Sequence, residues 1–201
     1  MNTRWTNAAE SVLKRGVKPG LVPRAIIDPD FERELDELRK ELAADKGAGA
    51  TERQALLSGL YLCNGSLDKS HTLAQGVPDA TGSYWHGIMH RMEPDYDNSR
   101  YWFRRTGRHP VFERLAKRTA EYLAGPGVMP HADTAAGKAL ARLASRDSWD
   151  PFLWIDIVAA QAGGRLGEEG LSAMLHIQWI ELTELLDFSF RACFGNSLLD
   201  R

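Results

Sequence analysis

Two histidines and a glutamate lie at helical spacing within residues 84–110 of the 201-residue sequence. His86, His90 and Glu93 occupy positions i, i+4 and i+7, so on an α-helix their side chains share one face. Two imidazoles and a carboxylate form a ligand set that a divalent metal such as zinc, iron or manganese accepts. The spacing predicts either a metal site with Glu93 as third ligand, or an acid/base pair with Glu93 as a general base.

A third histidine comes shortly before this row in the sequence. Asp68 and His71 are three residues apart, so on a helix the carboxylate can touch the imidazole and orient it. We expect His71, positioned by Asp68, to be a second proton-transfer group of the same site. The catalytic candidates are therefore His71, His86, His90, Glu93 and Asp68.

The same histidines also have a structural interpretation, which the sequence leaves open. Two histidines four residues apart occur often by chance, and buried histidines are commonly hydrogen-bonded core residues. The row also lacks the internal glutamate of H-E-x-x-H, so the mechanism of the proteases that carry that motif does not apply. An enzyme requires these imidazoles to converge on an accessible cleft, whereas a scaffold does not.

Arginines and aromatic residues follow the histidine row. We expect an anionic small molecule to be bound by five residues of this block: Arg91, Tyr101, Trp102, Arg104 and Arg105. The guanidinium group holds carboxylate and phosphate through two hydrogen bonds, and an outward indole can form a binding wall. The arginine signal is weak, because the chain has 18 Arg and 7 Lys throughout, and nearby acidic residues can also pair with these charges.

Acidic residues stand out on the apolar C-terminal segment. Glu181, Glu184 and Asp187 are spaced by three, and Asp156 is alone within an apolar run. A buried carboxylate must be paired, protonated or bound to a metal. We expect some of these residues to meet the histidines or arginines of residues 84–110. The alternative is an acidic stripe at the exposed edge of the last helix.

Capping residues and apolar periodicity predict helices almost throughout. Asp28 is expected to cap a helix over 29–42 that has Pro29 at its first position. Thr51 with Gln54 has the pattern of a capping box, and Ser66 is a plausible cap for the helix that carries His71.

The predicted fold class is all-α, an irregular bundle of about eight helices around a long C-terminal helix from about 168 to 193. No segment alternates as a strand would. We expect a single helical domain over 1–201. The irregular segment 125–135 is a candidate lid, and only its closure would bring His131 to the site.

Composition limits the class of protein. The 25 Lys and Arg against 27 Asp and Glu argue against a nucleic-acid partner, and two distant cysteines exclude a disulfide framework. We expect no membrane partner and a cytoplasmic location, since neither a membrane-spanning run nor a signal-peptide pattern is present. Without a glycine-rich phosphate loop, no nucleotide cofactor is expected. The oligomeric state stays open.

Two stretches carry a family resemblance: SHTLAQ at 70–75 and GSYWHGIMHRMEPDYDNSRYWFRRTGRHPVF at 82–112. The chain resembles an uncharacterised family of bacterial and fungal proteins marked by these motifs. The resemblance covers about forty residues closely and transfers no mechanism. It implies only that His71, His86, His90, Glu93 and the Arg/Trp block belong together.

Two functions are consistent with the sequence. The first is an enzyme that acts on a small anionic or polyhydroxylated metabolite through a His/Glu site, with or without a divalent metal, and an arginine-lined pocket. The second is a non-catalytic helical module that binds a ligand or a partner protein, with structural histidines.

Overall fold

A computed structural model describes residues 3–45 and 47–199 of the chain. Over that range the structure is all-helical, with ten helices and no strand, which confirms the predicted class and corrects the expected number of about eight. The helices are α1 (Thr3–Lys14), α2 (Pro29–Ala44), α3 (Ala50–Cys63), α4 (Leu67–Ala74), α5 (Ala80–Met92), α6 (Tyr96–Thr106), α7 (Val111–Leu123), α8 (Ala135–Ala144), α9 (Pro151–Ala162) and α10 (Leu171–Phe194).

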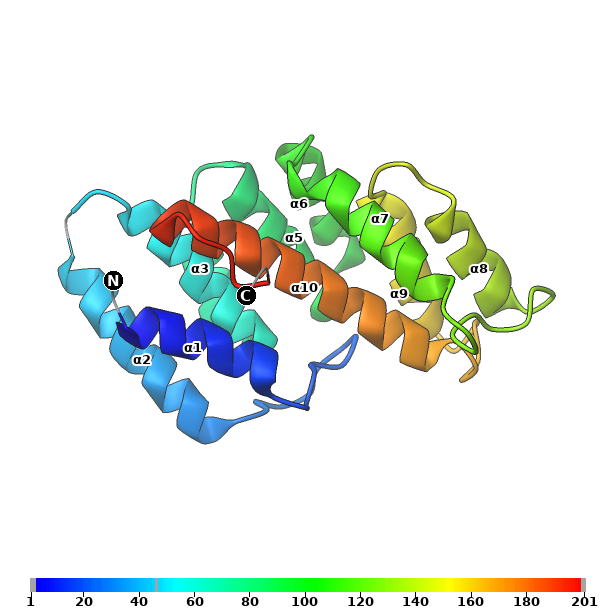
Figure 1. The fold of residues 1–201 in the computed structure, drawn as a ribbon, viewed down its shortest axis with the longest axis horizontal. Coiled ribbons are helices and arrows are strands. Elements are labelled where there is room, and N and C mark those ends of the chain that lie inside the picture. The colour runs from blue at the N-terminus through cyan, green and yellow to red at the C-terminus, as the bar shows by residue number, and fades with distance from the viewer. Residues whose placement is uncertain (1–2, 46, 200–201) are drawn as a thin grey trace.

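The long helix α10 crosses the molecule and packs against α1, α3 and α7 (Figure 1). Helices α1 and α2 lie at one end in this view, and α8 and α9 at the other. Between Ala173 and Phe190 most side chains of α10 are buried, as expected for a helix that is apolar around most of its circumference. None of the helices within the described ranges combines the length and the hydropathy that crossing a bilayer requires.

Aspartate caps begin the helices that frame the site. The Asp28 side chain accepts hydrogen bonds from the amides of Asp30 and Phe31, with Pro29 at the first helical position, as predicted. Asp79 accepts from the amide of Gly82 at the start of α5, and Asp95 accepts from that of Asn98 at the start of α6. These caps fix where α5 and α6 begin, and therefore which face each helix presents.

Ser66 is the N-cap residue of α4, as predicted, but neither its side chain nor the Thr51–Gln54 pair makes a capping hydrogen bond, because tertiary partners replace the local ones. Helix α3 begins after Gly49, and Gln54 donates instead to the carbonyl of Leu73 on α4, at 2.8 Å. The Ser66 hydroxyl donates to Glu32 of α2 and does not cap α4. Both side chains connect helices rather than begin them, and they fix α4 against α2 and α3.

Gly87 on α5 allows helix α6 to pack closely against α5. A Cβ atom at Gly87 would lie 2.9 Å from the ring of Phe103 on α6, closer than side chains tolerate. The Ser99 hydroxyl of α6 donates to the Gly87 carbonyl at 2.7 Å. This contact fixes α6 against α5 and brings Trp102 over the histidine row.

Candidate metal centre

Three imidazole rings converge where α4 packs against α5. His71 comes from α4, and His86 and His90 come from successive turns of α5; one ring nitrogen of each lies within 4.8 Å of the others. The ring centroids are 4.5 Å apart for His71 and His86, and 4.9 Å apart for His86 and His90. The third ligand-type group at this point is therefore His71, whereas the helical spacing predicted Glu93.

His86 is the most enclosed member of this three-histidine cluster. Its side chain is almost wholly buried, with 2% of the residue exposed. Neither Nδ1 nor Nε2 has a hydrogen-bond partner among the described residues. Leaving a buried polar atom unpaired costs about 1–3 kcal/mol. Such an atom in a folded protein calls for a partner, which for a ring nitrogen between two other imidazoles is a proton donor or a metal.

The other two histidines contact side chains through their Nδ1 atoms. Glu93 Oε2 lies 3.2 Å from Nδ1 of His90, and Gln75 Nε2 lies 3.2 Å from Nδ1 of His71. The contact of Glu93 is an ion-pair distance rather than a hydrogen bond, since His90 Nδ1 has no hydrogen-bond partner among the described residues. Metal-binding histidines usually present one nitrogen to the ion while a neighbouring polar group orients the other.

These contacts correct two predicted roles. Glu93 is not among the groups that converge within 4.8 Å, and its carboxylate lies 3.2 Å from His90 Nδ1. Asp68 does not orient His71 in the structure, since the described contact of the His71 ring nitrogen is with Gln75. Gln75 was not singled out in the sequence, although its position four residues after His71 places it on the same helical face.

Burial favours the neutral form of His86 and His90. Loss of hydration, together with the neighbouring His71 and His90, lowers the pKa of His86 to about 3. The pKa of His90 is lowered by the same loss of hydration and by His71, against the opposing effect of Asp95 and Glu93. Neutral imidazole is the form that binds metal ions.

Trp102 forms one wall of the cluster. Its indole stacks on the His86 ring at 3.8 Å between centroids and 14° between planes. The Arg105 guanidinium lies 5.3 Å from the Trp102 ring, and Tyr101, 47% exposed, meets the same indole edge-on. Arg104 is exposed on the same helix. Of the predicted binding residues, Tyr101, Trp102 and Arg105 therefore lie together beside His86.

Arg91 does not belong to this surface, contrary to the prediction. It is fully buried, and its guanidinium pairs with Glu181 of α10, which also accepts from the Tyr84 hydroxyl. An arginine enclosed with its counter-ion is not accessible to a ligand. Its position after His90 directs it from α5 toward α10, away from α4.

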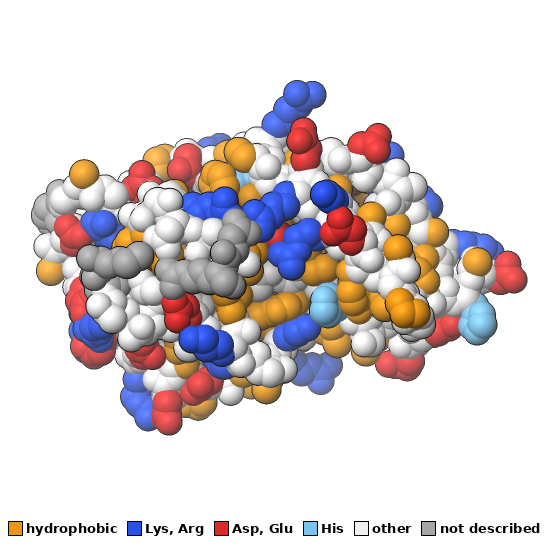
Figure 2. Space-filling view, in the orientation of Figure 1, with side chains coloured by type: hydrophobic (Ala, Val, Ile, Leu, Met, Phe, Trp, Pro, Cys, Tyr) orange, Lys and Arg blue, Asp and Glu red, His pale blue; other side chains and the backbone are white. Residues whose placement is uncertain are grey.

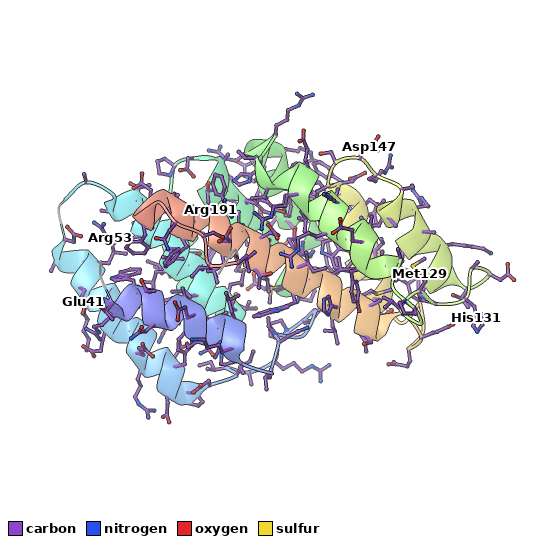
Figure 3. All side chains as sticks on the ribbon, in the orientation of Figure 1. Glu41, Arg53, Met129, His131, Asp147 and Arg191 are labelled. Atoms are coloured by element: carbon purple, nitrogen blue, oxygen red, sulfur yellow. The ribbon has the colours of Figure 1, made fainter. Side chains whose placement is uncertain are left out.

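The acidic residues of α10 form a buried row rather than an exposed stripe. Glu181, Glu184 and Asp187 are each at most 2% exposed, which makes the exposed alternative wrong. Each one pairs with at least one arginine, and none of the three is paired with a histidine of the cluster. Figure 2 shows basic side chains gathered where α7 crosses α10, and Figure 3 labels Arg191 at this row.

Asp156 pairs with Arg100, which connects α9 to α6. Together with the pair of Arg91 and Glu181, this confirms that some of the acidic residues meet arginines of residues 84–110.

His131 and His176 lie outside the cluster. His131 is exposed near the tip of the loop before α8 (Figure 3), and its amide donates to Glu169 at 2.9 Å. His176 stacks on Tyr122 and so is also outside the cluster.

Comparison of the chain with protein-family models, with curated proteins and with solved structures finds no match in any of the three. The function is therefore argued from the site alone.

Proposed function

We propose that the chain is a metal-dependent enzyme whose divalent ion is held by His71, His86 and His90. The observation that carries the proposal is the convergence of three ring nitrogens around His86, whose own two nitrogens have no hydrogen-bond partner. Three histidines are a known ligand set for zinc at catalytic centres.

The cluster is close to the size that a metal requires. Three atoms no more than 4.8 Å apart surround a point within about 2.8 Å of each, whereas zinc–imidazole bonds are about 2.0–2.1 Å long. Binding therefore needs each nitrogen to move inward by less than about 1 Å, which side-chain rotation can supply. Gln75 and Glu93 contact Nδ1 of His71 and His90, and polar neighbours of this kind orient metal-binding histidines.

Three protein ligands leave a coordination position for water or substrate. A metal in such a centre lowers the pKa of bound water to about 7 and polarises an oxygen of the substrate. Hydrolysis of a small molecule is the reaction that this chemistry favours, ahead of isomerisation and elimination. Arg105, whose guanidinium lies 5.3 Å from the Trp102 ring, is the arginine best placed to hold a carboxylate or phosphate group of the substrate.

The test is the metal content of the purified chain after it is supplied with zinc, manganese or iron. We expect one equivalent in the wild type and in the control His131→Ala, and loss of that equivalent in His71→Ala and His86→Phe. At one hundred times the Kd, the metal should raise the free energy of unfolding of the wild type by about 2.7 kcal/mol. Circular dichroism verifies that each variant is folded.

A wild type that binds none of the three metals contradicts the proposal, as do folded His86→Phe and His71→Ala variants that keep the metal. The stacking of His86 on Trp102 favours the second candidate function, a non-catalytic binding module in which these rings are packing groups. That alternative predicts a metal-free protein in which His86→Phe is folded and unchanged in ligand binding.

A further inference from the structure

A partly buried lysine meets a histidine where the loop after α1 reaches α10 (Figure 1). Nζ of Lys18 lies 3.2 Å from Nδ1 of His176, a residue of α10 that is 158 positions away in the sequence. The loop is fixed at this point, because the side chain of Gln178 on α10 donates to the carbonyl of Gly20 at 2.8 Å. The backbone that follows Lys18 therefore keeps its side chain beside the imidazole.

The neighbours of the Lys18 amine are aromatic rings rather than carboxylates. His176 stacks on Tyr122 of α7 at 3.9 Å between ring centroids and 7° between planes, which fixes the orientation of the imidazole. The amine also lies 6.0 Å from the ring of Trp179. Among the described residues, no carboxylate pairs with Lys18. A lysine without a carboxylate partner lacks the contact that usually stabilises its charged form.

Partial burial and nearby positive charge favour the neutral forms of the amine and the imidazole. Loss of hydration lowers the pKa of Lys18. The pKa of His176 is lowered by loss of hydration and by the charges of Lys18 and Arg118. Glu184 pairs with Arg118 but is shared with Arg114, so one carboxylate faces two guanidinium groups. Loss of hydration and a neighbouring cation are the means by which proteins turn a lysine into a nucleophile.

We propose that Lys18 forms a Schiff base with a small anionic aldehyde or ketone, and that His176 is its proton-transfer partner. The contact between Nζ and Nδ1 supplies the path for the proton, and the positive charge of Arg118 attracts the anionic group. None of the three cluster histidines takes part, so the reaction does not depend on the metal centre.

The reaction begins when His176 Nδ1 takes a proton from the Lys18 ammonium group. The free amine attacks the carbonyl carbon while a proton moves from its nitrogen to the carbonyl oxygen, which gives a carbinolamine. The imidazolium then returns its proton to the hydroxyl group, water leaves, and an iminium C=N bond remains. In sum, an ammonium group and a carbonyl group give an iminium ion and water, so neither an oxidant nor a reductant is consumed.

The probes are pyridoxal phosphate and pyridoxal, two aldehydes that differ in the phosphate group. The purified full chain is incubated with each probe, the imine is reduced with borohydride, and mass spectrometry of peptides measures the labelling of each lysine. We expect pyridoxal phosphate to label Lys18 at least about tenfold faster than Lys14 and Lys117. Those two side chains are 75% and 76% exposed, but each amine pairs with a glutamate. Pyridoxal, which lacks the anionic group, should label Lys18 about tenfold more slowly than pyridoxal phosphate does.

His176→Phe tests the proton-transfer partner, because it keeps a ring in the stack and removes Nδ1. Labelling of Lys18 should fall by about tenfold or more, and labelling of Lys14 should stay unchanged. The matched control is His131→Ala, which removes an exposed histidine from the loop before α8 and should be labelled as the wild type is. Circular dichroism verifies that each variant is folded.

Three results would overturn the proposal. The first is labelling that follows exposure, with Lys14 or Lys117 modified as fast as Lys18. The second is a folded His176→Phe variant in which Lys18 reacts as in the wild type. The third is equal labelling of Lys18 by pyridoxal and pyridoxal phosphate, which would exclude the preference for an anionic carbonyl compound.

Discussion

The carboxylate row of α10 and the three-histidine cluster are both buried polar groups, and they differ in how their atoms are satisfied. Every carboxylate of the row has a cationic partner: Glu181 has Arg91, Glu184 has Arg114 and Arg118, and Asp187 has Arg191. Both ring nitrogens of His86 have no partner in the described structure. The carboxylates of the row are therefore paired by the chain's own atoms, whereas the ring nitrogens of His86 are not.

This difference indicates a structural role for the carboxylate row and a ligand-binding role for the three-histidine cluster. A buried ion pair holds helices in register, and its free energy depends on both partners being present. A buried imidazole without a partner contributes nothing comparable, so its polar atoms are available to an added group. Changes to the row should therefore affect stability, and changes to the cluster should affect metal binding and the response to pH.

The largest expected effect comes from breaking the innermost ion pair. Glu181→Gln leaves the fully buried Arg91 without its counter-ion, which should lower the free energy of unfolding by about 3–5 kcal/mol. Urea unfolding followed by circular dichroism measures this loss. The double variant Arg91→Met with Glu181→Leu should recover most of it, since no charge is then left unpaired in the interior.

A loss below about 1 kcal/mol in Glu181→Gln would show that the pair is not the structural element that its burial indicates. The carboxylate row and the three-histidine cluster would then no longer differ in their contribution to stability. Asp133→Asn, on an exposed loop, is the control for loss of one negative charge.

The second effect is a pH dependence of the metal-free protein. The His86 imidazole titrates near 6.5 in the unfolded chain and at about 3 in the folded one, because burial disfavours its charged form. The unfolded chain therefore binds the proton first, and stability falls as the pH drops from 6.5 toward 3. By pH 5 the expected contribution of His86 is about 2 kcal/mol.

His86→Phe removes that contribution while keeping a ring on Trp102, so its stability should decline less between pH 7 and pH 5 than that of the wild type. Urea unfolding in the presence of a chelator at both pH values measures the difference. His109 serves as an internal reference, since burial lowers its pKa to about 4 in both proteins. Equal declines in variant and wild type would contradict the neutral, buried state of His86.

The smallest effect concerns the residue that supports His90. Glu93→Gln keeps an oxygen that can accept from Nδ1 of His90 and removes the charge, so zinc affinity should fall by about tenfold with little change in stability. Competition with a chromophoric chelator measures the affinity. Asp97→Asn, an exposed acid in the first turn of α6, is the matched control. A variant that binds zinc as the wild type does would exclude a supporting role for Glu93.

The helical class and the pairing of His86 with His90 could be read from the sequence, because both depend on positions only a few residues apart. Aspartate caps such as Asp28 and Asp95 are local in the same way. The hydrogen bonds of Gln54 and Ser66 could not be predicted, since their partners on α4 and α2 are distant in sequence and no local pattern reveals them.

The same difference between local and long-range contacts applies to the candidate site. The arginines were predicted as a group, yet burial separates Arg91 from Arg105. Arg91 lies on α5 and pairs with Glu181 of α10, whereas Arg105 lies on α6 beside Trp102. His71 was linked to the row by its residue type, but the position of its ring between His86 and His90 is a property of the α4–α5 packing.

The spacing of the ligands along the chain has a consequence for folding. His71, His86 and His90 belong to one short stretch of consecutive helices, so bringing them together closes only a small loop at a small entropic cost. The pair of Arg91 and Glu181 joins residues 90 positions apart, so it can form only after α10 has packed against α5. Contacts between near neighbours in sequence form sooner than distant ones. We therefore expect the three histidines to come together early in folding. The ion pairs of the carboxylate row should form later, when α10 packs against the other helices.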